Sequence, residues 1–175
     1  MLIYSDLDGT LLDHFTYQSA AASQTLEQLK NANIPVILNT SKTFAELEII
    51  NNELNLNSPF IIENGAAMYI PINTFKKQPE DTIAIGNYWM KSFCLPRLYW
   101  LKLLSENTKE FNNCYRGFSS ISASTLCKIT GLNLDEAKRA KQRQYGEPIL
   151  WLGNEATKKR FIEHLVDLGA NVVQG

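Results

Sequence analysis

Residues 1–13 read MLIYSDLDGTLLD, and they place two carboxylates, Asp6 and Asp8, directly after a short apolar run. We predict a β-strand over 2–5 and a tight turn at Gly9. Ligands of parallel α/β sheets bind beyond the carboxyl ends of the strands, which is where both carboxylates would lie. Like charges this close repel unless a cation or a shared proton relieves them, and Mg²⁺ does so while leaving room for a phosphate. The alternative is that Asp8 and Gly9 only form a turn and that Asp6 only caps a helix.

The next 60 residues alternate between strand and helix patterns. The run IPVILNT does not alternate with polar residues, which is typical of a strand that is buried on both faces. A strand, helix, strand, helix, strand order predicts a parallel, doubly wound sheet. The predicted strands cover 2–5, 34–40, 59–64 and 65–72, and the predicted helices cover 18–32 and 42–56.

The pattern of the sequence changes at KKQPEDT, a polar segment that begins at Lys76 and contains proline. We therefore predict a core domain over 1–75 and a second, α+β domain over 76–175. Helix patterns with starting and ending signals recur in this second part, and the last six residues, ANVVQG, predict a strand. The predicted helices cover 96–111, 122–130, 133–144 and 154–169.

Composition limits the classes of partner. The 175 residues carry 17 Lys and Arg against 18 Asp and Glu, a formal net charge of −1. This balance argues against nucleic acid or an anionic membrane as the main partner, so we expect a small molecule. No apolar stretch reaches membrane-spanning length, and the acidic N-terminal region is unlike a signal peptide, which predicts a cytoplasmic protein. The three cysteines have no metal-binding spacing and are expected to be free thiols.

The segment DLDGT resembles the first motif of the haloacid dehalogenase superfamily. The resemblance implies a Rossmann-like α/β core in which Asp6 is the nucleophile and forms an aspartyl phosphate. It implies that Asp8 protonates the leaving oxygen and then deprotonates the hydrolytic water. It also implies Mg²⁺ as cofactor, held by the side chain of Asp6 and the main-chain carbonyl of Asp8.

Two further segments fit this family. In VILNTSKT, the resemblance assigns Thr40 to the phosphoryl group, and we expect the amides of Ser41 and Lys42 to open the next helix, a natural anion site. The alternative is an ordinary helix cap at Thr40 or Ser41. In IIENGAAMY, Glu63 and Asn64 would lie at the mouth of the site, unless they only form a polar hairpin turn.

The passage RGFSSISASTLCKITGLNLDEAKRAKQRQYGEPILW resembles the cap domain of the mannosyl-3-phosphoglycerate phosphatase family. A substrate with a sugar, a carboxylate and a phosphate needs cationic and hydrogen-bonding groups. We expect Arg143 to bind the carboxylate or the phosphate, because its planar fork suits bidentate contact, and Glu147 to bind sugar hydroxyls. Lys42 could add charge beside the phosphate. The alternative for Arg143 is a solvated position on a lysine-rich helix.

The superfamily's later motifs, a lysine and an acid pair that completes the metal site, have no match in this sequence. The sequence therefore predicts a core that is incomplete at its C-terminal end, either as a fragment or as a natural truncation. An incomplete core leaves a sheet edge unpaired, which predicts a homo-oligomer or poor solubility. Asp13 and Lys42 are weak candidates to replace the missing groups.

The leading hypothesis is a Mg²⁺-dependent phosphatase that hydrolyses mannosyl-3-phosphoglycerate or a related sugar phosphate. The alternatives are a catalytically inactive sugar-phosphate binding fragment, a protein-interaction fragment, and a phosphotransferase that uses the same aspartyl phosphate. His14 and His164 are expected to lie at the surface, outside the mechanism.

Overall fold

The computed structural model describes residues 1–12 and 20–173, and the chain divides into two compact units, Met1–Cys94 and Leu95–Gly175. The boundary that we predicted near Lys76 falls inside the first unit. The reason is that two short strands after Lys76, β5 (Ile83–Ile85) and β6 (Tyr88–Ser92), pair onto the sheet of the first unit. Asp13 and His14 lie outside the described residues.

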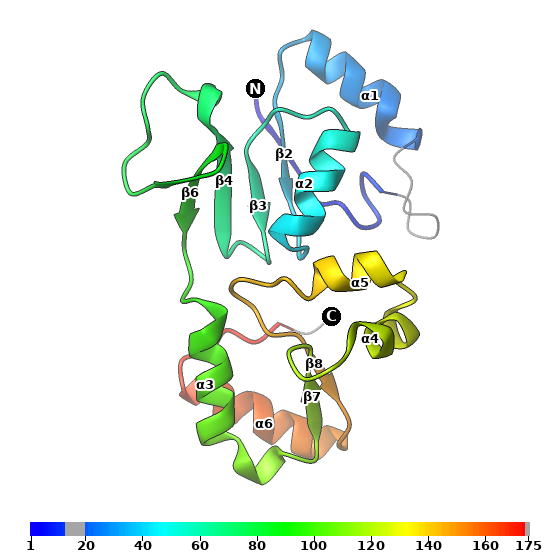
Figure 1. The fold of residues 1–175 in the computed structure, drawn as a ribbon, viewed down its shortest axis with the longest axis vertical. Helices are drawn as coiled ribbons and strands as arrows, with labels where there is room; N and C mark the ends of the chain where they lie inside the picture. The colour runs from blue at the N-terminus through cyan, green and yellow to red at the C-terminus, as the bar shows by residue number, and fades with distance from the viewer. Residues whose placement is uncertain (13–19, 174–175) are drawn as a thin grey trace. The chain divides into compact units, whose positions relative to one another are not determined.

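The first unit is built on a six-stranded sheet in the order β1-β2-β3-β4-β6-β5 (Figure 1). Its remaining strands are β1 (Ile3–Ser5), β2 (Val36–Asn39), β3 (Phe60–Ile62) and β4 (Ala67–Pro71). The first three strands are parallel and the others pair antiparallel. The predicted α/β class and the strand-helix alternation are confirmed, but the sheet is mixed because β3 and β4 join through a tight hairpin rather than a helix.

The helices of this unit, α1 (Ala20–Asn31) and α2 (Phe44–Glu53), connect β1 to β2 and β2 to β3. Crossovers between parallel strands have a fixed right hand, so both helices are expected on one face of the sheet. Ser5 pairs with Leu38, and Leu38 pairs with Phe60. This register brings the carboxyl ends of β1, β2 and β3 to one edge, where the polar motifs of the sequence begin.

An aromatic cluster joins α2 to the sheet. The ring of Phe44 lies 4.4 Å from the ring of Tyr69 and 5.9 Å from that of Phe60, centre to centre, and Phe60 and Tyr69 stack at 5.6 Å. Leu47 of α2 and Leu38 of β2 are fully buried. Figure 1 shows α2 in front of β2 and β3. Aromatic pairs of this kind contribute about 0.5–1.5 kcal/mol each beyond their area burial, so the start of α2 is firmly held.

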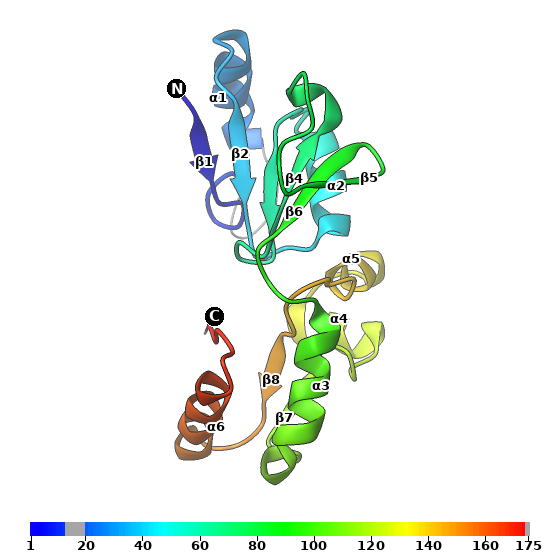
Figure 2. The same cartoon turned by 90° about the vertical axis from the view of Figure 1, so that its left-hand side faces the viewer.

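The second unit is built around a two-stranded antiparallel ribbon of β7 (Tyr115–Gly117) and β8 (Ile149–Trp151). Helices α3 (Arg97–Asn107) and α6 (Glu155–Asp167) pack beside this ribbon (Figure 2), and α4 (Ala123–Thr130) and α5 (Leu134–Ala140) form a helical pair. The helices have separate apolar clusters. One contains Leu103, Leu104, Phe111, Phe161 and Leu165, and the other contains Ile121, Leu126, Ala137 and Ala140.

The four helices predicted in this part are present, but the strand predicted at its end is not. Ala170 to Val173 form no strand, and the two residues after them lie outside the described part of the chain. His164, which we expected at the surface, is partly buried, with its Nε2 2.8 Å from the carbonyl oxygen of Asn107 and its ring 6.0 Å from that of Phe111. Over the described residues, no helix is long and apolar enough to cross a membrane.

Candidate active site

The two carboxylates leave β1 on a short loop that the backbone closes on itself. The amide of Leu12 donates to the carbonyl of Leu7 at 2.8 Å, and the amide of Gly9 donates to the carbonyl of Leu12 at 3.0 Å. Gly9 has a φ of +71°, a conformation that suits glycine. Leu7 is fully buried, and it separates Asp6 from Asp8, so the loop is anchored by the apolar residue between its two acids.

A cleft of about 550 Å³ opens at this edge of the sheet. Five predicted site residues line it together, from three separate segments: Asp6, Asp8, Thr40, Ser41 and Asn64. The sequence analysis did not single out the other lining residues, which are Tyr4, Ser5, Asn39 and Gly65. Each of these four residues is within two positions of a predicted site residue at a strand end. That nearness to a strand end was the signal that could have identified them.

Lys42 does not line the cleft, but it forms an ion pair with one of the carboxylates. Its Nζ lies 2.9 Å from Oδ1 of Asp8, and the two side chains are 16% and 38% exposed. The sequence predicted that a cation or a shared proton would relieve the repulsion between Asp6 and Asp8. The structure supplies such a cation from the protein itself, and it neutralises Asp8.

Residues 40–42, which follow β2, precede α2 and are not part of its first turn. The N-cap of α2 is Thr43, whose side chain accepts from the amide of Glu46, while the Glu46 carboxylate accepts from the amide of Thr43. This reciprocal capping box corrects two expectations: neither Thr40 nor Ser41 is the cap, and the amides of Ser41 and Lys42 do not open the helix.

Thr40 is therefore not needed as a helix cap. It is 3% exposed, and its Oγ1 accepts from the amide of Lys42 at 3.3 Å. Its amide donates to the carbonyl of Ile61 at 3.2 Å, which continues the parallel pairing of β2 and β3 past the last strand residue. The Thr40 side chain is thus fixed at the floor of the cleft.

Glu63, Asn64 and Gly65 form the hairpin turn between β3 and β4, and all three have left-handed φ angles, of +49°, +60° and +91°. The predicted turn and the predicted place at the cleft mouth are both present for Asn64, which lines the cleft. Glu63 differs, because its side chain is only 5% exposed and does not belong to the lining.

Asp6 and Asp8 provide a partial set of oxygen ligands for Mg²⁺. The described residues contain no group of three His, Cys, Asp or Glu side chains that could hold a metal ion. Mg²⁺ keeps several waters and is commonly bound through one or two carboxylates and substrate phosphates. Two acids in a polar cleft fit that mode of binding, in which the phosphate completes the ligand set.

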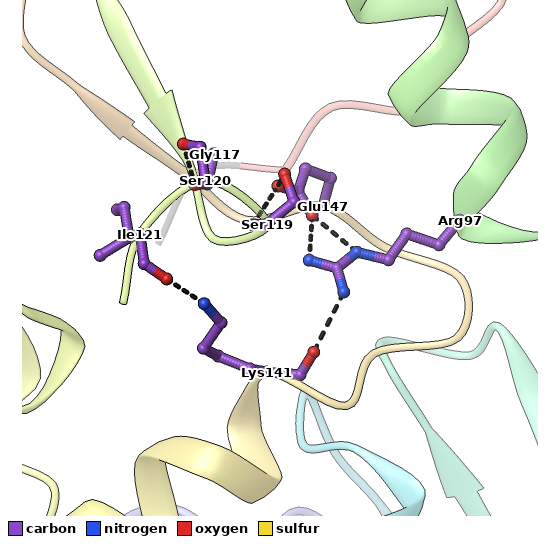
Figure 3. A network of polar contacts seen from close by, with 7 residues as sticks. All are labelled: Arg97, Gly117, Ser119, Ser120, Ile121, Lys141 and Glu147. Carbon is purple, nitrogen blue, oxygen red and sulfur yellow. Dashed lines mark hydrogen bonds and ion pairs between the residues drawn. The ribbon is translucent and has the colours of Figure 1, made fainter. Parts of the chain in front are cut away.

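In the second unit, Glu147 joins three segments through a network of polar contacts (Figure 3). Its side chain is 3% exposed, and Oε2 accepts from Nε and Nη2 of Arg97. Oε1 accepts from the amide and the hydroxyl of Ser119, at 2.8 and 2.7 Å. A carboxylate has about four acceptor sites, and these bonds fill them. The predicted binding of sugar hydroxyls by Glu147 does not fit this geometry.

Gly117 makes room for this carboxylate. A Cβ at Gly117 would lie 2.4 Å from Oε1 of Glu147, closer than any real Cβ contact. Arg97 also donates through Nη1 to the carbonyl of Lys141 at 3.0 Å, and Nζ of Lys141 donates to the carbonyl of Ile121. The loops at 117–121 and 141–147 are therefore tied to the first residue of α3.

Arg143 belongs to the second of these loops, 141–147. It follows the end of α5 at Ala140 and its C-cap Lys141, so it is in a loop, and the alternative of a solvated helix position does not apply. The residue is partly buried and its Nε is buried. A partly buried arginine on a braced loop suits the anion-binding role predicted for it, which stays a prediction.

The fold and cleft define an α/β protein in which paired acids follow the first strand and a hydroxyl follows the second, at the sheet edge where such folds bind ligands. Comparison with known proteins agrees. Residues 3–88 match the haloacid dehalogenase-like hydrolase family. The protein belongs to this family.

Two curated relatives are glucosyl-3-phosphoglycerate/mannosyl-3-phosphoglycerate phosphatases. The one from Methanococcoides burtonii is 38% identical over 174 residues, which is 99% of this chain and 64% of the relative. The one from Persephonella marina is 32% identical over 157 residues, which is 86% of this chain and 55% of the relative. The chain thus spans 64% and 55% of the length of these relatives, less than two thirds of either.

Solved structures with the same fold are more distant in sequence. A hypothetical protein from Geobacillus kaustophilus matches with a TM-score of 0.58 at 15% identity, over 94% of this chain and 62% of that one. A haloacid dehalogenase-like hydrolase from B. subtilis matches with a TM-score of 0.51 at 17% identity, over 94% and 66%. These likenesses support the fold.

We expect the substitution Glu147→Gln to destabilise the second unit by about 3 kcal/mol, because it leaves the guanidinium of Arg97 buried without its countercharge. The matched control is Glu110→Gln, which removes the exposed ion pair with Arg160 at 3.0 Å, where the side chains are 58% and 65% exposed. That change should cost less than about 1 kcal/mol. Hydrogen exchange of residues 95–173 at increasing urea concentrations measures the loss of unfolding free energy for both substitutions. Equal losses would contradict the structural role of Glu147.

Proposed function

We propose that this chain carries the nucleophile-bearing part of a Mg²⁺-dependent phosphatase that hydrolyses a phosphorylated sugar acid of the glucosyl- or mannosyl-3-phosphoglycerate type. The observation that supports it most is the convergence of Asp6, Asp8 and Thr40 on one cleft. The two curated relatives are named for these substrates and match over 99% and 86% of this chain. Identity of 38% supports the class of substrate more firmly than the particular sugar.

In the proposed reaction, a carboxylate oxygen of Asp6 attacks phosphorus. The new bond joins that oxygen to phosphorus, and the bond from phosphorus to the ester oxygen breaks. Asp8, protonated for this step and no longer ion-paired with Lys42, donates that proton to the leaving ester oxygen. A water then attacks the aspartyl phosphate, Asp8 takes its proton, and inorganic phosphate leaves with Asp6 restored. One side chain thus forms the covalent bond and its neighbour moves both protons.

The residues after β2 hold the phosphoryl group in this proposal. Thr40 supplies a hydroxyl from the floor of the cleft, and Ser41 lines the cleft beside it. Lys42 does not line the cleft, but its ammonium lies 2.9 Å from Oδ1 of Asp8 and so supplies positive charge behind one acid of the cleft. Asn64 completes the mouth from the neighbouring hairpin, while Glu63 is buried behind it in the same turn.

The side chain of Asp6 and the main-chain carbonyl of Asp8 would hold Mg²⁺, as the family implies. When bound, the ion neutralises charge on the phosphoryl oxygens and helps to orient them. The chain's own part is to present two acids on a rigid loop and to keep Lys42 against one of them.

The second unit is proposed to be the cap domain that recognises the rest of the substrate. Arg143 would bind its carboxylate or phosphate, since a guanidinium fork suits bidentate contact. Glu147, whose acceptor sites are filled by Arg97 and Ser119, would instead brace the two loops beside Arg143.

A second candidate function is a catalytically inactive sugar-phosphate binding module. It is favoured by the absence of a three-ligand acidic group in the described part of the chain. The two candidates differ in whether substrate is consumed or only held.

The test is phosphate release from mannosyl- and glucosyl-3-phosphoglycerate by this chain, with Mg²⁺ or with EDTA. We expect turnover that depends on the metal and that falls by roughly 1,000-fold or more in Asp6→Asn, because the nucleophile is removed. The control is Asp135→Asn. Asp135 is an exposed acid on α5 that forms an ion pair with Lys138. Binding without turnover in the unmodified chain would favour the second candidate, and neither binding nor turnover would reject both.

The proposal also includes self-association through β1. In the described sheet β1 has a neighbour on one side, and its Tyr4 and the preceding Leu2 are 58% and 46% exposed. An open apolar edge is a template for pairing with another strand. We expect sedimentation velocity to show dimers or larger species that Tyr4→Lys shifts toward monomer. Leu98→Lys, at a 77% exposed position on α3, should not do so, and a monomeric parent chain would contradict this part.

A further inference from the structure

The hairpin turn at residues 63–65 holds two non-glycine residues in a left-handed conformation, as a type I′ turn requires of its central residues. Its three residues, Glu63, Asn64 and Gly65, all have left-handed φ angles, of +49°, +60° and +91°. A left-handed conformation costs most L-residues about 1–2 kcal/mol, and asparagine tolerates it better than most. Only Gly65 is free of this cost. Such strain persists where the surrounding structure fixes it, and it concentrates at functional sites.

The left-handed turn points two successive amides at one target. The amide of Asn64 donates to the carbonyl of Thr40 at 2.9 Å, and the amide of Glu63 donates to the carbonyl of Lys42 at 3.0 Å. In an extended strand, successive amides point to opposite sides, so an extended backbone at 63–64 could make one of these bonds but not both. Consecutive left-handed residues direct both amides to the same side.

Both acceptors belong to the 40–42 loop, which is the segment proposed to hold the phosphoryl group. The two bonded carbonyls lie on either side of Ser41, so the turn fixes this loop at both ends. Thr40 is at the floor of the cleft, and Lys42 reaches Asp8 from the other end of the same loop. The strained turn and the ion pair with Asp8 are therefore connected through three residues of backbone.

We infer that Asn64 is a positioning residue, whose left-handed backbone, more than its side chain, holds the 40–42 loop ready for a phosphate dianion. This inference rests on the proposed function, because it assigns a role within the same site. Loss of the left-handed conformation would release the carbonyls of Thr40 and Lys42 together. The loop would then populate other conformations. The apparent affinity for phosphate would be the intrinsic affinity multiplied by the fraction of molecules that keep the competent conformation.

Two substitutions at Asn64 separate the backbone from the side chain. Asn64→Gly removes the side chain and keeps the left-handed conformation accessible, whereas Asn64→Ala removes the side chain and strains that conformation. A role through side-chain contact with the substrate predicts that both substitutions are equally harmful. A role through the backbone predicts that glycine restores most of what alanine loses.

The experiment is a titration of the chain with inorganic phosphate in the presence of Mg²⁺, followed by the amide NMR signals of Thr40 and Ser41. We expect Asn64→Ala to bind phosphate about tenfold more weakly than the parent chain, and Asn64→Gly to recover most of that loss. The matched control is the same pair of substitutions at Asn55, another left-handed asparagine, with a φ of +51°, in the loop that follows α2. Neither control should change phosphate binding.

Equal weakening by glycine and alanine at Asn64 would overturn the inference. A parent chain that binds no phosphate would instead reject the proposed function, and the inference is then decided by hydrogen exchange. Asn64→Ala must speed exchange at the amides of Glu63 and residue 64 relative to Asn64→Gly, beyond any difference between the two Asn55 variants. Equal exchange in the two Asn64 variants would overturn the inference on its own.

Discussion

The parallel pairing of β1 with β2 is the constraint on which the candidate site depends. Ser5 stands beside Leu38 in this pairing, so the residues that follow each strand emerge at the same edge of the sheet. Asp6 and Thr40, which are far apart in the chain, line one cleft for this reason. The aromatic contacts of Phe44 then hold α2 against the sheet, and the capping box at Thr43 fixes where the helix begins. The intervening residues are left to form the cleft wall.

The charges of the site follow from this arrangement. Two acids separated by a single buried leucine share one mouth, and Lys42 neutralises Asp8 at 2.9 Å. Asp6 forms no ion pair with the other described residues, which suits its proposed role as nucleophile. In the second unit, an ion pair has a structural role rather than a role at the cleft. There the buried pair of Arg97 and Glu147 ties loops together, and such a pair acts through geometry rather than through net stabilisation.

Much of the first unit could be predicted from the sequence, because its signals are local. The apolar runs, the D-x-D-G-T segment and the helix periodicities each lie within a few residues, and the predicted strand-helix order was confirmed. The strands β5 to β8 were missed because they are only three to five residues long, and because β6, β7 and β8 pair with segments that are distant in the chain. The ion pair of Lys42 with Asp8 and the bond of Arg97 to Glu147 join residues that only the folded chain brings together.

The central claim is that Asp6 forms a covalent bond to phosphorus. The most direct measurement is to incubate the chain with Mg²⁺ and a phosphorylated sugar acid, quench the mixture in acid, reduce any acyl phosphate with borohydride, and identify the modified residue by mass spectrometry. The account predicts conversion of Asp6 to homoserine, with Asp8 unchanged. Modification at Asp8, or no modification at either acid, would contradict it.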